Sequence, residues 1–489
     1  MDIRERCIGA AGCLLIAAVL LLFCSQCSPL YPINVWGDAN CLLTVGRVMR
    51  AGGVLYRDIY EQKGPTLYLI QAAAAAIDDT SFLGVYVMEV LSLGAALFFA
   101  FRILRGRLCV IGSLSGAALL GAGMLVCSAF MKGNSAEEFC LPALMGTLWL
   151  AAEKTDDETG LLAPWALFCC GLAAGVVATI KYSILGLFLG LCAAEGIAAL
   201  RHGGLRRALV SAGVFLGGML LPIVLWIAYF AAHGALRDFY TAYLYNNIFL
   251  YEAEGALSAL QAVKAVLRYA WDNALWVLLS SLGVLHICLF SSERAHTRLA
   301  AALMAFGTLV GVCFLGRLWV YCPLVLSVFG VYGVRAALEG FAGFMNARGW
   351  LWYRRVVPAA AFAAALAAAV WFSPNAYLRG EPLDQMAQGR LAKFVHEGAT
   401  LLQYSHLDDG LYLAADRLPQ QKYFVRLNVG YDEMRRELDR YVEEAIPDYV
   451  LVTWEPLPEQ FDRYQLIATD AGYDEQNRIN KMFYLYRRR

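Results

Sequence analysis

Long apolar runs separated by short polar connectors dominate the chain up to residue 373. The first run covers 7–27, and later runs cover 83–101, 108–130, 139–152, 164–181, 182–199, 208–232, 273–290, 299–316, 318–338 and 356–373. About 20 apolar residues are what a helix needs to cross the hydrocarbon core of a bilayer. Because backbone polar groups must be satisfied internally there, the pattern predicts a polytopic α-helical membrane protein with about 11 transmembrane helices.

The placement of arginine orients these predicted helices. The basic connectors lie at 101–107, 201–207, 291–298 and 339–355, and such connectors stay in the cytoplasm. With eleven spans and a cytoplasmic N-terminus, in which 7–27 serves as a retained signal anchor, all four fall on the cytoplasmic side. The segments 28–82, 131–138, 233–272 and everything after residue 373 then lie outside. We therefore expect a multi-pass protein of the plasma membrane.

The pattern changes after Ser373. Strand-like runs at 421–428, 447–454 and 482–488 alternate with helix-like runs at 383–398 and 431–446. This alternation predicts a small C-terminal extracytoplasmic α/β domain at 374–489. It would follow a transmembrane domain at 1–373, whose first outer loop is 28–82. Acids and bases are mixed in the C-terminal segment as on an ordinary solvated face. We therefore expect this segment to have an accessory role, in handling an acceptor substrate, and no catalytic role.

Composition agrees with a membrane protein and narrows the partners. Hydrophobic residues make up 60% of the chain and charged residues 16%, and the formal net charge is zero. A balanced charge gives no reason to expect a nucleic-acid partner. The 14 cysteines lie mostly inside apolar runs and none follows Cys322, which is typical of small core residues and not of a disulfide scaffold. The six histidines show no metal-ligand spacing, so neither a metal nor another cofactor is expected.

The first outer loop carries dense charge beside the membrane. Within 35–77, an amphipathic segment runs from Asp38 to Gly52-Gly53, and an extended piece then leads into Lys63-Gly64-Pro65. Pro65 suits the first position of a further helix. Carboxylates and cations outside the cell next to the bilayer suit a lipid-phosphate substrate, because its anionic head needs Lys or Arg donors. We interpret this stretch as a site.

Three acids are candidates for catalysis. Transfer of a sugar from a phosphate needs a carboxylate to take the proton of the incoming hydroxyl. Asp38 is the first acid after the first span, and capping of the following helix is an alternative or additional role for it. Glu137 and Glu138 begin the run 139–152, where acids also suit the helix dipole without any catalytic function.

Cations and further polar residues extend the candidate site. The candidate ligands of a donor phosphate are Lys63, Arg57, Lys181 and Arg317, and the candidate substrate-lining residues are Asp58, Glu61, Tyr68, Tyr245 and Asn246. Ionisable residues between apolar runs, and long loops such as 233–272, are often functional. The alternatives are snorkelling lysines, polar turns, solvated loop charges and aromatic residues of the membrane interface.

The motifs of the first loop resemble those of the C-type superfamily of membrane glycosyltransferases (GT-C). The likeness rests on Asp38 just after the first span, on the turn YRDIYEQKGP and on the helix entry KGPTLY at 63–68. It is similar in particular to bacterial protein O-mannosyltransferases and to lipid A aminoarabinose transferases. Two departures are that Ala39 follows Asp38 where the mannosyltransferases have an acidic pair, and that Gly64 replaces a proline. The usable motifs cover roughly residues 1–150.

The resemblance implies an inverting transfer of a monosaccharide from a polyprenyl-phosphate-linked donor to a glycan, lipid or protein acceptor. It implies Asp38 as general base, Lys63 as a ligand of the donor phosphate, and Glu137 or Glu138 as a second acid, mostly without a metal. A polysaccharide polymerase or ligase is an alternative, but its key residues would lie in one late loop. A lipid-linked glycan transporter would show internal repeats and broken polar helices, and a non-enzymatic assembly factor is a third possibility.

Overall fold

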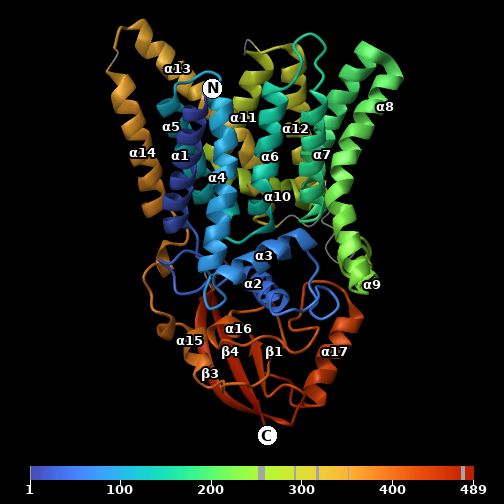
Figure 1. Cartoon of the computed structure of the whole chain (residues 1–489). Helices are drawn as coiled ribbons and strands as arrows, with labels where there is room; N and C mark the ends of the chain where they lie inside the picture. The colour runs from blue at the N-terminus through green and yellow to red at the C-terminus, as the bar shows by residue number, and fades with distance from the viewer. Residues whose placement is uncertain (1, 252–258, 291–292, 315–318, 351, 475–478) are drawn as a thin grey trace.

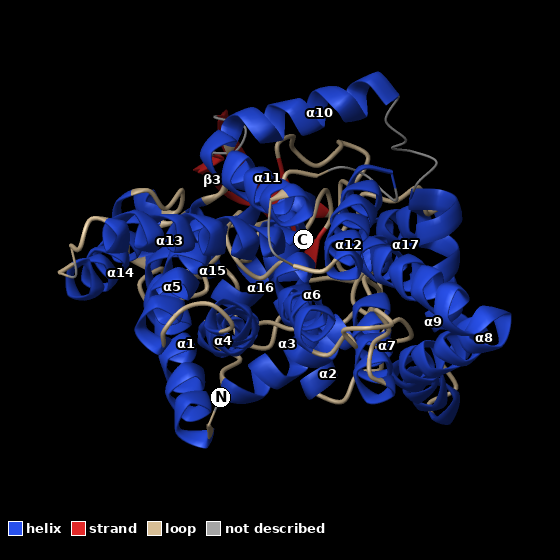
Figure 2. Ribbon diagram, turned by 90° about the horizontal axis from the view of Figure 1, so that it is seen from above, coloured by secondary structure: helices blue, strands red, loops and turns tan. Residues whose placement is uncertain are grey.

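The structure is a computed structural model that describes residues 2–251, 259–290, 293–314, 319–350, 352–474 and 479–489. Figure 1 shows a bundle of roughly parallel helices, with the strands gathered beyond one end of the bundle. Figure 2 looks along the bundle and shows α4 and α6 end-on.

Ten helices make up most of this bundle in the part of the chain that the structure describes. They are α1 (Ile3–Cys24), α4 (Leu83–Arg105), α5 (Val110–Val126), α6 (Ala136–Glu153), α7 (Pro164–Ala178), α8 (Gly186–Ala232), α11 (Ala274–Leu289), α12 (Ala295–Phe314), α13 (Gly330–Ala347) and α14 (Tyr353–Trp371). Helix α8 is broken at Gly204, where φ is 63°. Its first half packs closely on α12 and its second half on α7, because a Cβ at Gly190 would meet the carbonyl of Leu303 and one at Gly218 would meet that of Phe168. The predicted runs 182–199 and 208–232 therefore correspond to two helices, which meet at the break at Gly204.

Length and composition support several membrane crossings. Among the described residues, five helices are long and apolar enough to cross, or six if the pair α10 (Ala259–Asp272) and α11, bent by 103°, counts as one span. Four further apolar helices in these ranges are shorter. The expected number of eleven therefore stays a prediction.

The described parts of the basic connectors lie at the end of the bundle away from the strands (Figure 1). Arg105 pairs with Glu5 at 2.8 Å, and Glu293 accepts from both Arg107 (3.3 Å) and Arg335 (2.8 Å). The N-terminus lies at this end, and the C-terminus lies at the opposite end (Figure 1). The shared location is what the positive-inside argument requires, and which side of the membrane it faces stays a prediction.

Short elements cover the other end of the bundle. Helices α2 (Gly37–Arg50) and α3 (Pro65–Ile77) lie across it (Figure 1), and a Cβ at Gly46 would come within 2.5 Å of the backbone of Gln71. The remaining elements are the 3₁₀ turns η1 (Ser128–Phe130), η2 (Tyr182–Leu185) and η4 (Cys322–Phe329), with α9 (Leu236–Phe239) and the π-helix η3 (Tyr240–Tyr251) in the aromatic connector. The connector expected as a loop at 233–272 is thus largely helical where it is described.

The C-terminal segment forms one four-stranded sheet with short helices. Its elements are η5 (Ala376–Leu378), η6 (Leu383–Gln385), α15 (Ala387–Ala392), β1 (Leu401–Gln403), α16 (Leu411–Ala414), α17 (Asp432–Glu443), β2 (Tyr449–Thr453), β3 (Tyr464–Asp474) and β4 (Ile479–Arg488). The strand order is β1-β2-β4-β3, with β1 and β2 parallel and the other pairs antiparallel. The small sheet is thus present as expected. The strand predicted at 421–428 is wrong, because this segment is not part of the sheet. It contacts the first loop instead, where the Lys422 carbonyl accepts a hydrogen bond from Tyr60 N (2.8 Å).

Polar contacts fix the C-terminal segment to the end of the bundle. Asn375 donates to the carbonyls of Cys24 (2.6 Å) and Met131 (2.9 Å) and accepts from Gln26 (3.0 Å). On α2, the buried Arg47 donates to the carbonyl of Arg417 at 3.0 Å. The Asn375 contacts therefore join the C-terminal segment to the end of α1, and the Arg47 contact joins it to α2, the helix that carries Asp38.

Candidate active site

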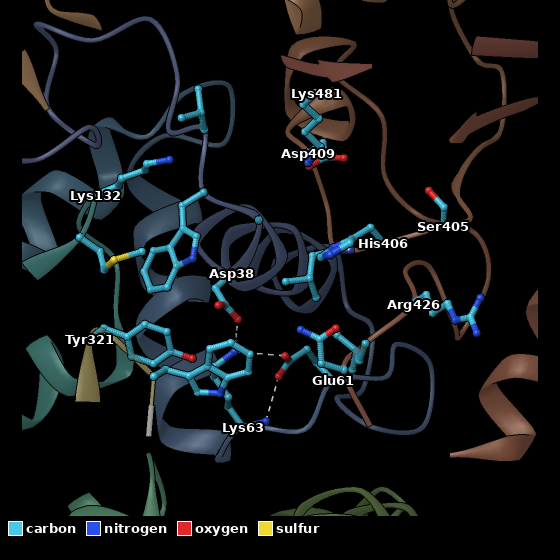
Figure 3. Close-up of a pocket in the computed structure, with 18 of the residues that line it drawn as sticks. Asp38, Glu61, Lys63, Lys132, Tyr321, Ser405, His406, Asp409, Arg426 and Lys481 are labelled. Carbon is cyan, nitrogen blue, oxygen red and sulfur yellow. Dashed lines mark hydrogen bonds and ion pairs between the residues drawn. The ribbon is translucent and has the colours of Figure 1, made fainter. Parts of the chain in front are cut away.

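A cavity of about 1000 Å³ lies between the end of the helical bundle and the C-terminal sheet. Figure 3 shows the first loop on one side of it and the C-terminal segment on the other. The charged and aromatic lining residues include Trp36, Asp38, Glu61, Lys63, Lys132, Lys181, Tyr243, Trp319, Tyr321, Arg390, His406, Asp409, Arg426, Arg435, Trp454, Lys481 and Phe483. Asp38, Glu61, Lys63 and Lys181, all predicted from the sequence, therefore share one cavity.

Asp38 lies in the first turn of α2. The helix begins at Gly37 after Trp36 and has no side-chain cap, so the capping alternative for Asp38 is not what the structure shows. Its carboxylate instead pairs with Lys63, with 2.9 Å between Oδ1 and Nζ, and its side chain is 18% exposed. The carboxylate therefore keeps access to the cavity.

Lys63 lies between two carboxylates. Its ammonium is 3.3 Å from Glu61 Oε1, and its backbone N–H donates to Glu61 Oε2 at 2.8 Å. Burial lowers the pKa of Lys63, but the charges of Asp38 and Glu61 outweigh it, so the pKa is raised above its ordinary value. A lysine ammonium has three donors, and these two acids take two of them.

The turn at Gly64 docks directly on the end of α7. Gly64 N donates to the Ile180 carbonyl and Thr66 N to the Thr179 carbonyl, each at 3.0 Å. A Cβ at position 64 would lie 2.2 Å from the Thr179 carbonyl oxygen, which explains why glycine stands there. Pro65 is the first residue of α3, as predicted. This docking brings Lys63 and Lys181 to the same cavity.

Lys181 forms the second charged contact of the site. Its Nζ is 2.5 Å from Oε1 of Glu137, which is 1% exposed, and 5.1 Å from the centre of the Tyr321 ring. That ring packs on Trp36, with 5.2 Å between centroids. Glu137 does not line the cavity itself and acts on it through Lys181.

Several predicted residues are not brought to this cavity. Arg57 pairs with Asp58 at 2.8 Å outside it, Tyr68 and Glu138 are buried in the packing, and Tyr245 is exposed elsewhere. Asn246 is buried and donates to Tyr60 OH at 2.7 Å, whereas its neighbour Asn247 lines the cavity and donates to the Gln62 carbonyl at 2.6 Å. One residue of a helical segment can face the site while the next faces away. Arg317 lies outside the described residues.

Sequence reasoning missed Lys132. It lies in a sharp turn where Met131, Gly133 and Asn134 have φ of 59°, 87° and 60°. A Cβ at Gly133 would lie 2.3 Å from Ser25 Oγ, so the turn is pressed against the end of α1. The Lys-Gly-Asn run at 132–134 is the local signal for this turn, because glycine and asparagine are the residues that most readily adopt positive φ.

Sequence reasoning also missed the whole C-terminal wall. The charges of this segment were expected on an ordinary solvated face, yet Arg390, Arg426, Arg435, Lys481 and Asp409 line the cavity. They come from α15, α17, β4 and two loops, so no local pattern groups them. Within the described ranges, no cluster of three or more His, Cys, Asp or Glu side chains is placed to hold a metal ion.

Comparison with known proteins addresses the fold. No protein-family model and no curated protein matches the sequence. Among solved structures, ArnT from Cupriavidus metallidurans bound to undecaprenyl phosphate matches with a TM-score of 0.63 and 11% identity, over 98% of this chain and 97% of that chain. Its apo structure gives 0.61 and 12%, over 96% and 95%. AglB from Archaeoglobus fulgidus, in complex with an inhibitory peptide and a dolichol-phosphate, gives 0.45 and 13%, over 91% and 69%.

This likeness establishes the fold. The chain has the architecture of ArnT along nearly its whole length, as the GT-C-like motifs of the first loop predicted. Together with its apolar helices, this makes the chain a multi-pass membrane protein with a small C-terminal sheet. At this identity the chemistry rests on the residues of the site.

Proposed function

We propose that the protein is a membrane glycosyltransferase that transfers a sugar, with inversion, from a polyprenyl-phosphate donor to an acceptor on the outer face of the membrane. The observation that carries the proposal is the pairing of Asp38 with Lys63 at a cavity that also contains Lys181, in a chain with the fold of ArnT. The structure of that protein contains undecaprenyl phosphate. The cavity lies at the end of the bundle opposite the basic connectors, where a lipid headgroup at the outer surface would reach it.

Asp38 is proposed as the general base. In the reaction, the acceptor hydroxyl transfers its proton to the Asp38 carboxylate while its oxygen attacks the anomeric carbon of the donor sugar. The bond between that carbon and the phosphate oxygen breaks on the opposite face, which inverts the configuration and releases polyprenyl phosphate. A positioned base of this kind contributes roughly 100–10,000-fold to the rate.

Lys63 and Lys181 are proposed as the cations for the donor phosphate. The phosphate gains negative charge as the glycosidic bond breaks, and fixed ammonium groups stabilise that charge. Lys63 has a donor left after it bonds Asp38 and Glu61. Glu137 is a positioning residue, because it holds the Lys181 ammonium from a buried site.

The direct test uses membranes that contain the protein and a polyprenyl-phosphate donor with a radiolabelled sugar. The proposal expects the label to move from the lipid to an acceptor or to water in membranes with the wild-type chain, and not in membranes without it. A donor that stays intact under both conditions would contradict the proposed activity. Whether the acceptor is a glycan, a lipid or a protein follows from the product that carries the label.

A further inference from the structure

Acids hold cations in place on both walls of the cavity. On the wall made by the helical bundle, Lys63 and Lys181 are held by the buried acids Glu61 and Glu137. On the C-terminal wall, Arg390 makes a bidentate pair with Asp470 at 2.6 Å. Acids fix the positions of these cations and reduce their net charge.

Lys481 is also held firmly on the C-terminal wall. It pairs with the buried Asp409, and its Nζ lies 5.5 Å from the Trp454 ring centre and 5.6 Å from that of Phe483. Trp454 has a φ of 73°, a strained value for a bulky residue that tends to occur at functional sites. The wall is therefore a rigid, shaped surface and not a set of loose side chains.

Arg426 differs from these residues. It is exposed on the cavity wall, and in the described part of the chain its guanidinium makes no ion pair or hydrogen bond. Its backbone N–H donates to the His406 carbonyl at 3.2 Å, and its neighbours Val425 and Leu427 are buried. The backbone is thus fixed while the side chain remains available in the cavity (Figure 3). A planar guanidinium with five donors matches a phosphate or a carboxylate.

The charged residues of the cavity also favour an anionic ligand at this wall. Among the described lining residues, seven are lysine or arginine and three are acidic. Three acids outside the lining, Glu137, Asp432 and Asp470, also pair with lining cations. A polyprenyl-phosphate sugar is a phosphodiester and carries one negative charge, so a donor bound at Lys63 and Lys181 leaves the guanidinium of Arg426, across the cavity, without an anionic partner among the described residues.

We propose that the C-terminal wall is a second anion subsite, centred on Arg426, that holds a phosphate or carboxylate of the acceptor. The naming of its ligand as the acceptor rests on the proposed function. The donor phosphate would lie at Lys63 and Lys181, and the acceptor anion would lie across the cavity at the C-terminal wall. From the sequence, we expected the C-terminal segment to help in handling the acceptor. The subsite gives it a specific role, the selection of an anionic acceptor.

The experiment measures binding of inorganic pyrophosphate to the purified full-length protein in detergent, with undecaprenyl phosphate present at saturation. The subsite predicts that pyrophosphate still binds, and that Arg426→Ala weakens this binding about tenfold or more, on the scale of a lost hydrogen bond to a charged group. Arg426→Lys should keep part of the affinity. Arg436→Ala is the matched control, because Arg436 is an exposed arginine of the same segment that does not line the cavity.

Two results would overturn the subsite. One is equal pyrophosphate affinity of the wild type and the Arg426→Ala variant, and the other is full displacement of pyrophosphate by undecaprenyl phosphate. Succinate in place of pyrophosphate distinguishes a carboxylate from a phosphate ligand, and Arg426-dependent binding of either supports the subsite. Failure of undecaprenyl phosphate to bind at all would instead count against the proposed function. In that case the dependence of pyrophosphate binding on Arg426 still tests the subsite by itself.

Discussion

Nζ of Lys63 lies 2.9 Å from Oδ1 of Asp38, although 25 residues separate the two along the chain. The helix α2 and the turn before α3 are folded back so that the proposed base and the proposed phosphate cation touch. An acid and a cation in contact can act on neighbouring bonds of one substrate, the hydroxyl that attacks and the phosphate that leaves. The first two predictions test this arrangement on the cation side.

Lys63→Gln should slow cleavage of a polyprenyl-phosphate sugar by the equivalent of about 3–4 kcal/mol, the scale of a lost charge-stabilising donor. Lys63→Arg should restore little of the rate, because the larger planar guanidinium does not fit between Asp38 and Glu61. Arg57→Gln is the matched control, since Arg57 is a cation of the same loop outside the cavity. Near-normal cleavage by Lys63→Gln would mean that Lys63 is only an interfacial anchor.

Gly64→Ala should displace the Lys63 turn without removing any charge. The added Cβ would lie 2.2 Å from the Thr179 carbonyl oxygen, and overpacking of this kind typically costs about 1–3 kcal/mol. We expect a lower thermal midpoint and slower donor cleavage together. Gly196→Ala, in the interior of α8 where a Cβ meets nothing within 4 Å, should lower neither property, and an unaffected Gly64→Ala variant would refute the docking of this turn on α7.

The stability of the protein should depend on pH through Asp408. This carboxyl is buried against α2, accepts from Thr44 Oγ1 at 2.7 Å, and has its pKa raised by burial to about 6. Because the folded state favours the protonated form, stability is gained as the pH falls through about 6 and is lost as the pH rises through it. Between pH 7.5 and 5, the wild type should gain about 1 kcal/mol relative to Asp408→Asn.

Thermal midpoints of both proteins in detergent at the two pH values check the Asp408 prediction. The variant replaces the titrating oxygen with an amide that can donate to the Thr44 hydroxyl, so it should lack this component. Parallel shifts of the two midpoints would assign the pH dependence to other groups.

The orientation in the membrane can be tested by thiol labelling. Single cysteines at the exposed positions Glu455 and His202, in a background without the 14 native cysteines, mark the two ends of the bundle. Glu455→Cys should react with an impermeant reagent in intact cells, and His202→Cys should react only after lysis. The reverse pattern would place the cavity in the cytoplasm and remove the basis for an outer-face reaction.

Local signals were enough to predict one wall of the site. The first acid after a span, the glycine stop and Pro65 are features of a short stretch, and they indicated both Asp38 and Lys63. The fold class followed from the apolar runs for the same reason. Lys63-Gly64-Pro65 was also predicted as a turn, but its docking on Thr179 depends on a contact between distant segments.

The other wall could not be predicted from local patterns. Arg426 lies in a segment whose alternating apolar and polar residues favoured a strand. Tertiary contacts place this segment outside the sheet and at the cavity wall. Asp58 and Tyr245 were chosen for their residue type and loop, yet the direction of their side chains is set by packing. Asn246 and Asn247 illustrate this, because adjacent positions of one helical segment differ in whether they reach the cavity.

The central claim is that Asp38 is the base of a sugar transfer from a lipid phosphate. The most direct measurement compares single-turnover cleavage of a labelled polyprenyl-phosphate sugar by the wild type, Asp38→Asn and the control Asp58→Asn, at equal abundance in the membrane. The account predicts a loss of roughly 100-fold or more for Asp38→Asn and wild-type-like cleavage for Asp58→Asn, whose carboxylate lies outside the cavity. Wild-type-like cleavage by Asp38→Asn would contradict the account.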